Sequence, residues 1–331
     1  MTKYKLVATA AAGIEALVGK ELRNMGYDVQ VENGKAFFEG DDYDIARTNI
    51  WLRTADRIKI IMGQFTAKTF DSLFEQTKAI PWEKILPVDA EFPVSGKSVK
   101  STLHSVPNCQ SIVKKAIVNR LSEAYHRRTH LPESGALYPI EVAILKDVVT
   151  LTIDTSGTSL FKRGYRTEKG GAPLKENMAA ALVMLTSWYP DKPFYDPTCG
   201  SGTIPIEAAL IGKNIAPGLN RSFAAEKWTF FTPGVFDKVR EEARKERDKR
   251  EILMRFNQFR DKCNGDWKPD WSTSEEKKYC IALFPRTGLC AISEDVFSSS
   301  LTLFGHFKKV NDCKRAIDLF GDEIKRLWVD E

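Results

Sequence analysis

Residues 194–210, which read F-Y-D-P-T-C-G-S-G-T-I-P-I-E-A-A-L, constrain the fold more than any other stretch of the chain. The two aromatic residues and the acidic residue that open it predict the end of a strand. Gly200 and Gly202 then predict a tight turn, and apolar residues from Ile204 onward recur at helical spacing. A strand, a glycine turn and a helix in this order form a ligand cradle. Glycine lets backbone approach a ligand closely, and the first turn of a helix offers unpaired N–H groups to an anion.

The residues of this turn narrow the choice of ligand. A Walker loop ends in Gly-Lys-Ser/Thr, and no lysine occurs here; a dinucleotide fingerprint needs a third glycine where the chain has Pro205. A strand-to-helix turn without any ligand remains the alternative. The longer string D-P-T-C-G-S-G-T-I resembles motif I of class I S-adenosylmethionine (SAM) methyltransferases that act on exocyclic amines of nucleic acids.

This resemblance implies a SAM site in the turn. Asp196 would accept a hydrogen bond from the ammonium group of the cofactor, and N–H groups after Gly202 would meet its carboxylate. Cys199 is expected to be a small turn residue, because no general base lies near it in the sequence. The full set of expected cofactor-binding residues is Asp196, Pro197, Thr198, Cys199, Gly200, Ser201, Gly202 and Thr203.

Composition bounds the class of protein. The chain has 331 residues, 43% of them apolar, which predicts about two or three domains with real cores. No long apolar run and no leader pattern is visible, so we expect a soluble cytoplasmic protein. Six cysteines without a C-x-x-C pair and four scattered histidines predict neither a disulfide framework nor a metal site. A net charge of +5 permits nucleic-acid binding without requiring it.

Residues 1–65 read as a small α+β unit of ferredoxin-like character. Apolar residues at helical spacing follow a first strand, Lys5–Ala10. Asn33-Gly34 is a strong hairpin signal. A second helix, Asp41–Thr54, and a strand, Arg57–Gln64, complete the unit.

Residues 66–158 predict a second α+β unit. Two helices (Thr69–Ile80, Ser111–Tyr125), a strand at Ala90–Val94 and a hairpin across Lys146-Asp147 are expected. Lysines near the strand end and on the second helix would form a phosphate-binding face, with an ordinary charged surface as the alternative. These are Lys97, Lys100, Lys114 and Lys115. The order of elements resembles a THUMP domain, which implies RNA binding through shape and backbone.

Residues 159–176 form the join to motif I. The strings R-G-Y-R and A-P-L-K-E-N-M-A-A resemble the segment that precedes motif I in THUMP-bearing ribosomal RNA guanine-N2 methyltransferases, the YpsC/RlmL-like family. Members are also labelled N6-adenine-specific DNA methylases. The resemblance implies that Arg163 and Arg166 face RNA phosphate or the cofactor; solvent-exposed linker arginines are the alternative. It also implies a Rossmann-like class I methyltransferase domain over residues 177–331.

The resemblance stops near Arg250. The family's next acidic strand end, G-x-D-(I/V)-(D/N), and its Asn-Pro-Pro-Tyr/Phe tetrapeptide are both absent. No catalytic residue can therefore be assigned, and the domain is expected to be incomplete. Our hypothesis is that residues 251–331 are read from a shifted frame or replaced, which makes the chain a truncated family member. A divergent second half-sheet is the alternative.

The leading functional prediction is a SAM-dependent RNA methyltransferase. Family resemblance implies the N2 amine of a guanine in large-subunit (23S) ribosomal RNA as the target. No membrane partner is expected, and the sequence does not predict an oligomeric state. A THUMP protein that binds RNA without catalysis is the first alternative, because the catalytic tetrapeptide is missing. A DNA adenine-N6 methyltransferase is the second, because motif I is shared.

Overall fold

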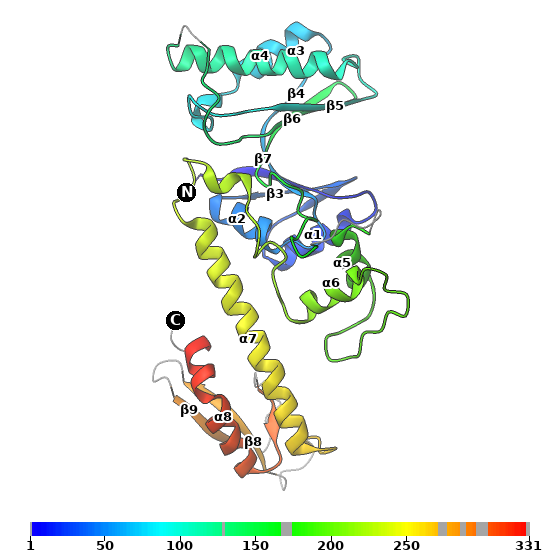
Figure 1. Ribbon diagram of the computed structural model, residues 1–331, viewed down its shortest axis with the longest axis vertical. Coiled ribbons are helices and arrows are strands. Elements are labelled where there is room, and N and C mark those ends of the chain that lie inside the picture. Colours follow the sequence, from blue (N-terminus) through cyan, green and yellow to red (C-terminus); the bar gives the residue numbers. More distant parts are fainter. Residues whose placement is uncertain are drawn as a thin grey trace. The chain divides into compact units, whose positions relative to one another are not determined.

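The computed structural model describes residues 2–127, 130–166, 174–270, 277–284, 289–295 and 304–328. They divide into two compact units (Figure 1). The first unit comprises residues 1–212 and 216–240, and the second comprises residues 213–215 and 241–331. No described helix is both long enough and apolar enough to span a bilayer. The four domain ranges expected from the sequence do not follow this division, and they stay a prediction.

The first module of the first unit has the expected ferredoxin-like order of elements. Asn33-Gly34 makes the predicted hairpin turn, with Gly34 at a φ of 71°. Asp41 caps the second helix in a capping box with Asp44, which explains why that helix begins there. The elements are β1 (Tyr4–Thr9), α1 (Glu15–Asn24), β2 (Gln30–Glu32), β3 (Lys35–Gly40), α2 (Asp42–Trp51) and β4 (Arg57–Thr66).

The second module follows with α3 (Phe70–Ala79), the 3-10 helix η1 (Trp82–Lys84), β5 (Val94–Val99), α4 (Val106–Ala124), β6 (Ile140–Leu145) and β7 (Val148–Asp154). Two expectations are corrected. The strand predicted at Ala90–Val94 lies at Val94–Val99, because Pro93 has no N–H to give to a ladder. The helix predicted from Ser111 begins five residues earlier, with a proline in its first turn, where proline is tolerated.

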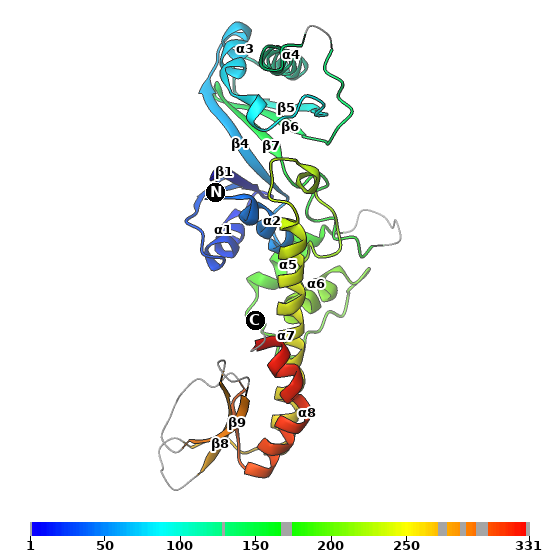
Figure 2. The same cartoon turned by 90° about the vertical axis from the view of Figure 1, so that its left-hand side faces the viewer.

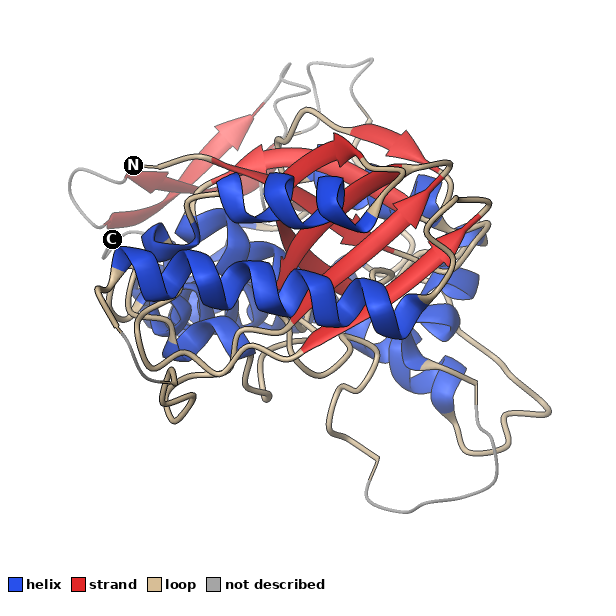
Figure 3. Cartoon of the chain, turned by 90° about the horizontal axis from the view of Figure 1, so that it is seen from above, coloured by secondary structure: helices blue, strands red, loops and turns tan. Residues whose placement is uncertain are grey.

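A single seven-stranded sheet joins the two modules, in the order β2-β3-β1-β4-β7-β6-β5 (Figure 2). The ten-residue strand β4 pairs with β1 of the first module and with β7 of the second. A bulge between Ile61 and Gly63 interrupts the β4–β7 pairing, and bulges increase the local twist of a sheet. Figure 3 shows helices packed against these strands.

The rest of the first unit packs back onto these modules. It contains α5 (Glu176–Leu185), α6 (Thr203–Gly212) and the 3-10 helix η2 (Ala224–Lys227). The helix α5 contacts α6, and its Ala181 joins Leu17 of α1 and Ile14, the residue before α1, in an apolar cluster. Further on, Trp228 stacks on Tyr138 of the THUMP-like module, with ring centroids 4.8 Å apart.

The second unit has a core of its own. The helix α7 (Val235–Asn264) crosses the boundary between the units and is followed by β8 (Lys278–Phe284), β9 (Leu289–Asp295), β10 (His306–Phe307) and α8 (Val310–Trp328). The sheet order is β10-β8-β9, and both pairings are antiparallel. Phe256, Phe307 and Ile324 are fully buried in this core. The densely charged run Lys238–Arg250 lies within α7, and α8 is amphipathic.

One expectation about the methyltransferase part is corrected. Phe194 and Tyr195 do not form a strand, and 86% of Tyr195 is exposed. A lone strand is not stable without neighbours, and the only parallel strand pair among the described residues is β5 with β6. The second unit has a buried core and the amphipathic helix α8. A shifted frame, a replaced segment and a divergent half-sheet over residues 251–331 all stay predictions.

Candidate functional site: a glycine loop and a lysine face

The glycine loop has the local geometry that the sequence predicts. Gly200 and Gly202 lie at φ values of 53° and 74°, where residues with a Cβ are strained. The N–H of Gly202 donates to the carbonyl of Cys199 at 2.8 Å, and the N–H of Thr198 donates to Asp196 Oδ1 at 3.2 Å. The helix α6 begins directly after the loop, at residue 203. The loop thus places the N-terminus of α6 directly after two glycines at positive φ.

Arg166 holds this loop from the linker. Its Nη2 donates to Thr203 Oγ1 at 2.6 Å and to the carbonyl of Leu174 at 2.7 Å, and its Nε lies 3.5 Å from Glu176 Oε1. Ser201 Oγ is 3.1 Å from the same Thr203 hydroxyl. Of the two places expected for Arg166, the structure puts it beside the predicted cofactor loop, as a tether between the linker and the first residue of α6.

Arg163 is placed differently from the sequence expectation. Only 4% of the residue is exposed, so it is not available to RNA phosphate. Its Nη1 donates to the carbonyl of Leu160 at 2.6 Å, its Nη2 donates to the carbonyl of Arg53, and its Nε lies 3.6 Å from Glu207 Oε1. An arginine in a Gly-rich linker is usually solvated; here a buried carboxylate on α6 draws it inward. The sequence alone gives no indication that Glu207 lies beside Arg163.

Glu207 is a buried charged residue beside the loop whose partners sequence reasoning did not find. It is fully buried on α6 and accepts a hydrogen bond from the Tyr165 hydroxyl at 3.0 Å, while its Oε2 has no hydrogen-bond partner. Burial raises the pKa of Glu207, and the nearby charge of Arg163 partly opposes this. Burial and the Glu207 carboxylate raise the pKa of Tyr165. The available signal was a lone glutamate in the otherwise apolar string T-I-P-I-E-A-A-L-I-G.

Buried polar side chains also connect this segment to the ferredoxin-like module. Glu21 on α1 accepts backbone N–H groups from Arg53 at 2.9 Å and Thr54 at 3.0 Å. On α5, Asn177 Nδ2 donates to Asp56 Oδ1 at 2.9 Å. Because Arg163 also donates to the carbonyl of Arg53, the segment that carries the glycine loop is anchored to the end of α2 by side-chain hydrogen bonds as well as by apolar packing.

The loop fits one part of SAM and not the whole molecule. Its positive-φ glycines and the start of α6 suit the charged amino-acid end of the cofactor. The described residues provide no strand before the loop and no neighbouring strand whose acidic end would hold the ribose hydroxyls. No group of three or more metal-binding side chains occurs in the described part of the chain. The described residues therefore supply only the part of the expected SAM site that would hold the amino-acid end of the cofactor.

The four predicted RNA-binding lysines do not lie on one face. Lys97 is on β5, half-exposed, with its Nζ 3.1 Å from Glu141. Lys114 is on α4, where its Nζ contacts Glu133 at 2.7 Å and lies 3.5 Å from the centre of the Phe92 ring. Lys115 is exposed on α4, and Lys100 is exposed beyond the end of β5. Only Lys97 belongs to the sheet surface.

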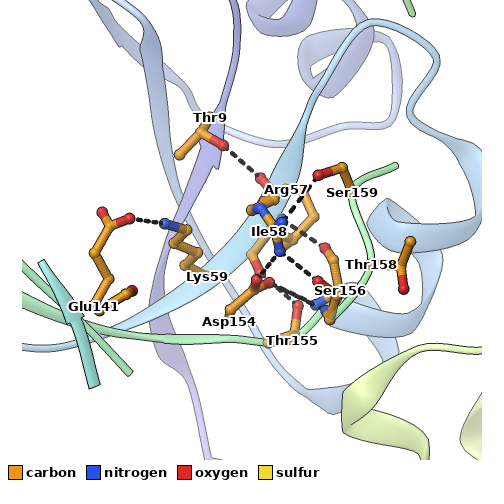
Figure 4. Close-up of polar contacts among 12 residues, drawn as sticks. Thr9, Arg57, Ile58, Lys59, Glu141, Asp154, Thr155, Ser156, Thr158 and Ser159 are labelled. Carbon is orange, nitrogen blue, oxygen red and sulfur yellow. Dashed lines mark hydrogen bonds and ion pairs between the residues drawn. The ribbon is translucent and has the colours of Figure 1, made fainter. Parts of the chain in front are cut away.

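The structure instead places lysines from three strands on the side of the sheet that faces away from the apolar core; one of them, Lys59, is buried. Lys59 of β4 donates to Glu141 at 2.9 Å, as Figure 4 shows, so that Lys59 and Lys97 share one carboxylate. Burial and then the charge of Lys97 lower the pKa of Lys35 on β3, with a smaller effect from Lys59. Lys35 also lies 6.0 Å from the centre of the Phe37 ring. We call Lys35, Lys59 and Lys97 the lysine face.

Comparison with known families finds three domain matches along the chain. Residues 5–59 match the RlmL ferredoxin-like domain, residues 67–154 match the THUMP domain, and residues 163–262 match the RMKL-like methyltransferase domain. The three matches follow one another along residues 5–262 in the order ferredoxin-like domain, THUMP domain and methyltransferase domain. The expected ferredoxin-like and THUMP modules are confirmed, as is the methyltransferase segment after them.

Named relatives of this RMKL-like chain include two curated proteins. The chain is 58% identical over 241 residues to YpsC of Bacillus subtilis, named as an RNA methyltransferase, which covers 72% of this chain and 63% of YpsC. It is 36% identical over 251 residues to the ribosomal RNA large subunit methyltransferase K/L of Syntrophotalea carbinolica, covering 74% of this chain and 35% of that protein. The chain therefore spans less than two thirds of either relative.

Two crystal structures resemble the chain closely. One is named a predicted N6-adenine-specific DNA methylase from Listeria monocytogenes; it is 66% identical with a TM-score of 0.73, over 74% of this chain and 65% of that one. The other is named a methyltransferase complexed with SAH; it is 56% identical with a TM-score of 0.72, over the same shares of both chains, 74% and 65%. In both cases about a third of the relative has no counterpart here.

Proposed function

We propose that this chain is part of a SAM-dependent RNA methyltransferase of the RlmK/L type, acting in the cytoplasm. The observation that carries the proposal is the joining, within one compact unit, of a THUMP-containing module and a motif I loop held by Arg166. We propose the N2 amine of a guanine in 23S ribosomal RNA as the target. The family resemblance of the join supports this choice, together with the name of the K/L relative.

The RNA-binding half of the proposal rests on the lysine face. Lys35 and Lys97 stand over one continuous sheet that spans both N-terminal modules. Lysine contacts to phosphates supply affinity without sequence preference, and an aromatic ring such as Phe37 can stack on an unpaired base. Glu141 is shared by Lys59 and Lys97, so the local charge stays positive.

The cofactor half rests on the glycine loop. SAM would supply an electrophilic methyl group when bound. Residues Asp196 to Thr203 would hold its amino-acid end, with the start of α6 facing the carboxylate. Arg166 would keep Thr203 and the loop in place through its hydrogen bond at 2.6 Å. No described residue is assigned to the methyl transfer itself.

A second candidate is favoured for the chain acting alone. Phe194 and Tyr195 form no strand, and the Asn-Pro-Pro-Tyr tetrapeptide is absent, so the isolated chain would bind RNA without methylating it. The name of the Listeria relative keeps a DNA adenine methyltransferase as a rival. The THUMP match argues for RNA over DNA.

The test measures binding to a 23S ribosomal RNA fragment by fluorescence anisotropy at several salt concentrations. Lys35→Ala with Lys97→Ala should weaken binding and reduce the slope of log K against log salt by about 2, one for each lost phosphate contact. The control Lys115→Ala removes an exposed lysine on α4 and should change the slope by less than that. Equal slopes for all three proteins, or tighter binding to duplex DNA of the same length, would count against the proposal.

A further inference from the structure

Exposed apolar side chains concentrate around the glycine loop. On α5, 42% of Leu182 and 64% of Leu185 are exposed; in the loop, Tyr195 is 86% exposed; and on α6, Ile206 is 37% exposed. Leu174 and Tyr189, which flank α5, are exposed as well. Six exposed apolar side chains on two packed helices and the segments beside them indicate a place where another element packs.

The sequences of the helices α5 and α6 also indicate that a further element packs on them. The helices α5, E-N-M-A-A-A-L-V-M-L, and α6, T-I-P-I-E-A-A-L-I-G, are apolar around most of their circumference. A helix of this composition is normally buried on more than one side. One side of α5 packs on α1 through Ala181, and α5 packs on α6. The side that carries Leu182 and Leu185 has no cover among the described residues.

The family match indicates what kind of element is missing. A helix pair of an α/β domain covers a mostly parallel sheet, and a glycine loop of this type follows one of its strands. Residues 163–262 match a methyltransferase domain, yet Phe194 and Tyr195 have no strand to pair with among the described residues. The chain covers 63% of YpsC, and 65% of each of the two crystal structures.

We propose that the α5–α6 face, defined by Leu182, Leu185, Tyr195 and Ile206, is the docking surface for a second polypeptide that carries the missing strands of a methyltransferase domain. The partner would place the apolar side of its sheet on this face and would pair one strand edge with the backbone of Phe194–Tyr195. Main-chain hydrogen bonds would fix the register, and apolar burial would supply affinity. This inference rests on the proposed function, because a motif I loop follows a strand of a methyltransferase sheet and the described residues contain no such strand.

The test co-expresses the full chain with a tagged fragment of Bacillus subtilis YpsC that comprises the part outside the match. Co-expression is needed because an isolated half-sheet exposes its own apolar face. The expected result is a one-to-one complex in sedimentation. Leu182→Asp with Leu185→Asp should weaken the complex at least tenfold. Both side chains are exposed, so circular dichroism of the variant chain should be unchanged.

The matched control is Leu145→Asp. It places the same charge at a leucine of similar exposure, 53%, at the end of β6, and it should leave the complex intact. Absence of a complex, or equal weakening by the control, would overturn the inference. A dimer of the chain alone that Leu182→Asp with Leu185→Asp dissolves would also overturn it, in favour of a second copy as the occupant.

A separate measurement distinguishes failure of the proposed methyltransferase function from failure of the docking inference. SAM binding to the complex is measured by equilibrium dialysis, and binding to the chain alone serves as reference. A complex that depends on Leu182 and Leu185 supports the docking surface whether or not it binds SAM. The same complex without any SAM binding would instead count against the proposed methyltransferase function.

Discussion

At the scale of the residue, Glu207 has the most unusual environment in the methyltransferase segment. Burial raises its folded-state pKa above the ordinary value of 4.5, so the folded protein holds this proton more tightly than the unfolded chain does. The contribution of Glu207 to the free energy of unfolding is therefore fully present below about pH 4.5 and is lost as pH rises through the folded-state pKa. Gln at position 207 cannot titrate and can still accept from Tyr165.

We predict that Glu207→Gln becomes more stable relative to the wild type as pH rises from 5 to 8. Urea unfolding of both proteins at four pH values in this range measures the difference. Glu21 and Asp154, whose pKa values burial also raises, are present in both proteins and cancel in the comparison. A difference in unfolding free energy that is constant, or that falls with pH, would contradict the raised pKa.

Gly218 provides a second prediction at this scale. Its N–H donates to the carbonyl of Ile50 at 2.9 Å, and an added Cβ would lie 2.7 Å from Ile50 Cα and 2.8 Å from the carbonyl oxygen of Asn49. Both are backbone atoms, so they cannot move aside easily. Gly218→Ala should lower the free energy of unfolding by about 1–3 kcal/mol. Gly212→Ala, whose nearest neighbour would be 3.5 Å away, should be neutral in the same urea titration.

At the scale of the element, residues 216–240 serve the N-terminal modules. Trp228 is 3% exposed, stacks on Tyr138 and donates from its indole nitrogen to the carbonyl of Leu137 at 2.9 Å. Trp228→Ala should destabilise the first unit by about 3–5 kcal/mol. Tyr195→Ala removes an aromatic ring that is 86% exposed and should change the unfolding free energy by less than 0.5 kcal/mol in rough terms. Similar losses for both variants would contradict this packing.

Elements with local signals could be predicted from the sequence. Asn33-Gly34 and Lys146-Asp147 specify hairpins through their own backbone preferences, and the Asp41–Asp44 capping box marks where α2 begins. The turn at Gly200 and Gly202 was likewise predictable, because positive φ is a property of the residue itself.

Features that depend on distant partners could not be predicted. Phe194 and Tyr195 read as a strand because local pattern cannot tell whether neighbouring strands exist. Arg163 was expected to face RNA phosphate or the cofactor, because nothing in the sequence shows that Glu207, 44 positions away, lies beside it. Lys59 and Lys35 were missed for the same reason: the sheet order that brings them toward Lys97 is set by β4–β7 pairing and not by spacing in the chain.

At the scale of the whole molecule, the chain contains two compact units that differ in architecture. The first unit contains the ferredoxin-like and THUMP modules and the glycine loop; the second contains a three-stranded antiparallel sheet with α8. The family match ends at residue 262, two residues before the end of α7. The core of the second unit therefore combines the end of a methyltransferase match with residues that lie beyond it.

Because the two units have separate apolar cores, we predict two unfolding transitions in differential scanning calorimetry of the full chain. Phe256 is fully buried between Phe304, Phe307 and Phe320, so Phe256→Ala should lower one transition, by an amount equivalent to about 3–5 kcal/mol. Trp228→Ala should lower the midpoint of the transition of the first unit and leave the transition of the second unit unchanged. A single transition that both variants shift equally would mean that the two cores unfold as one cooperative body.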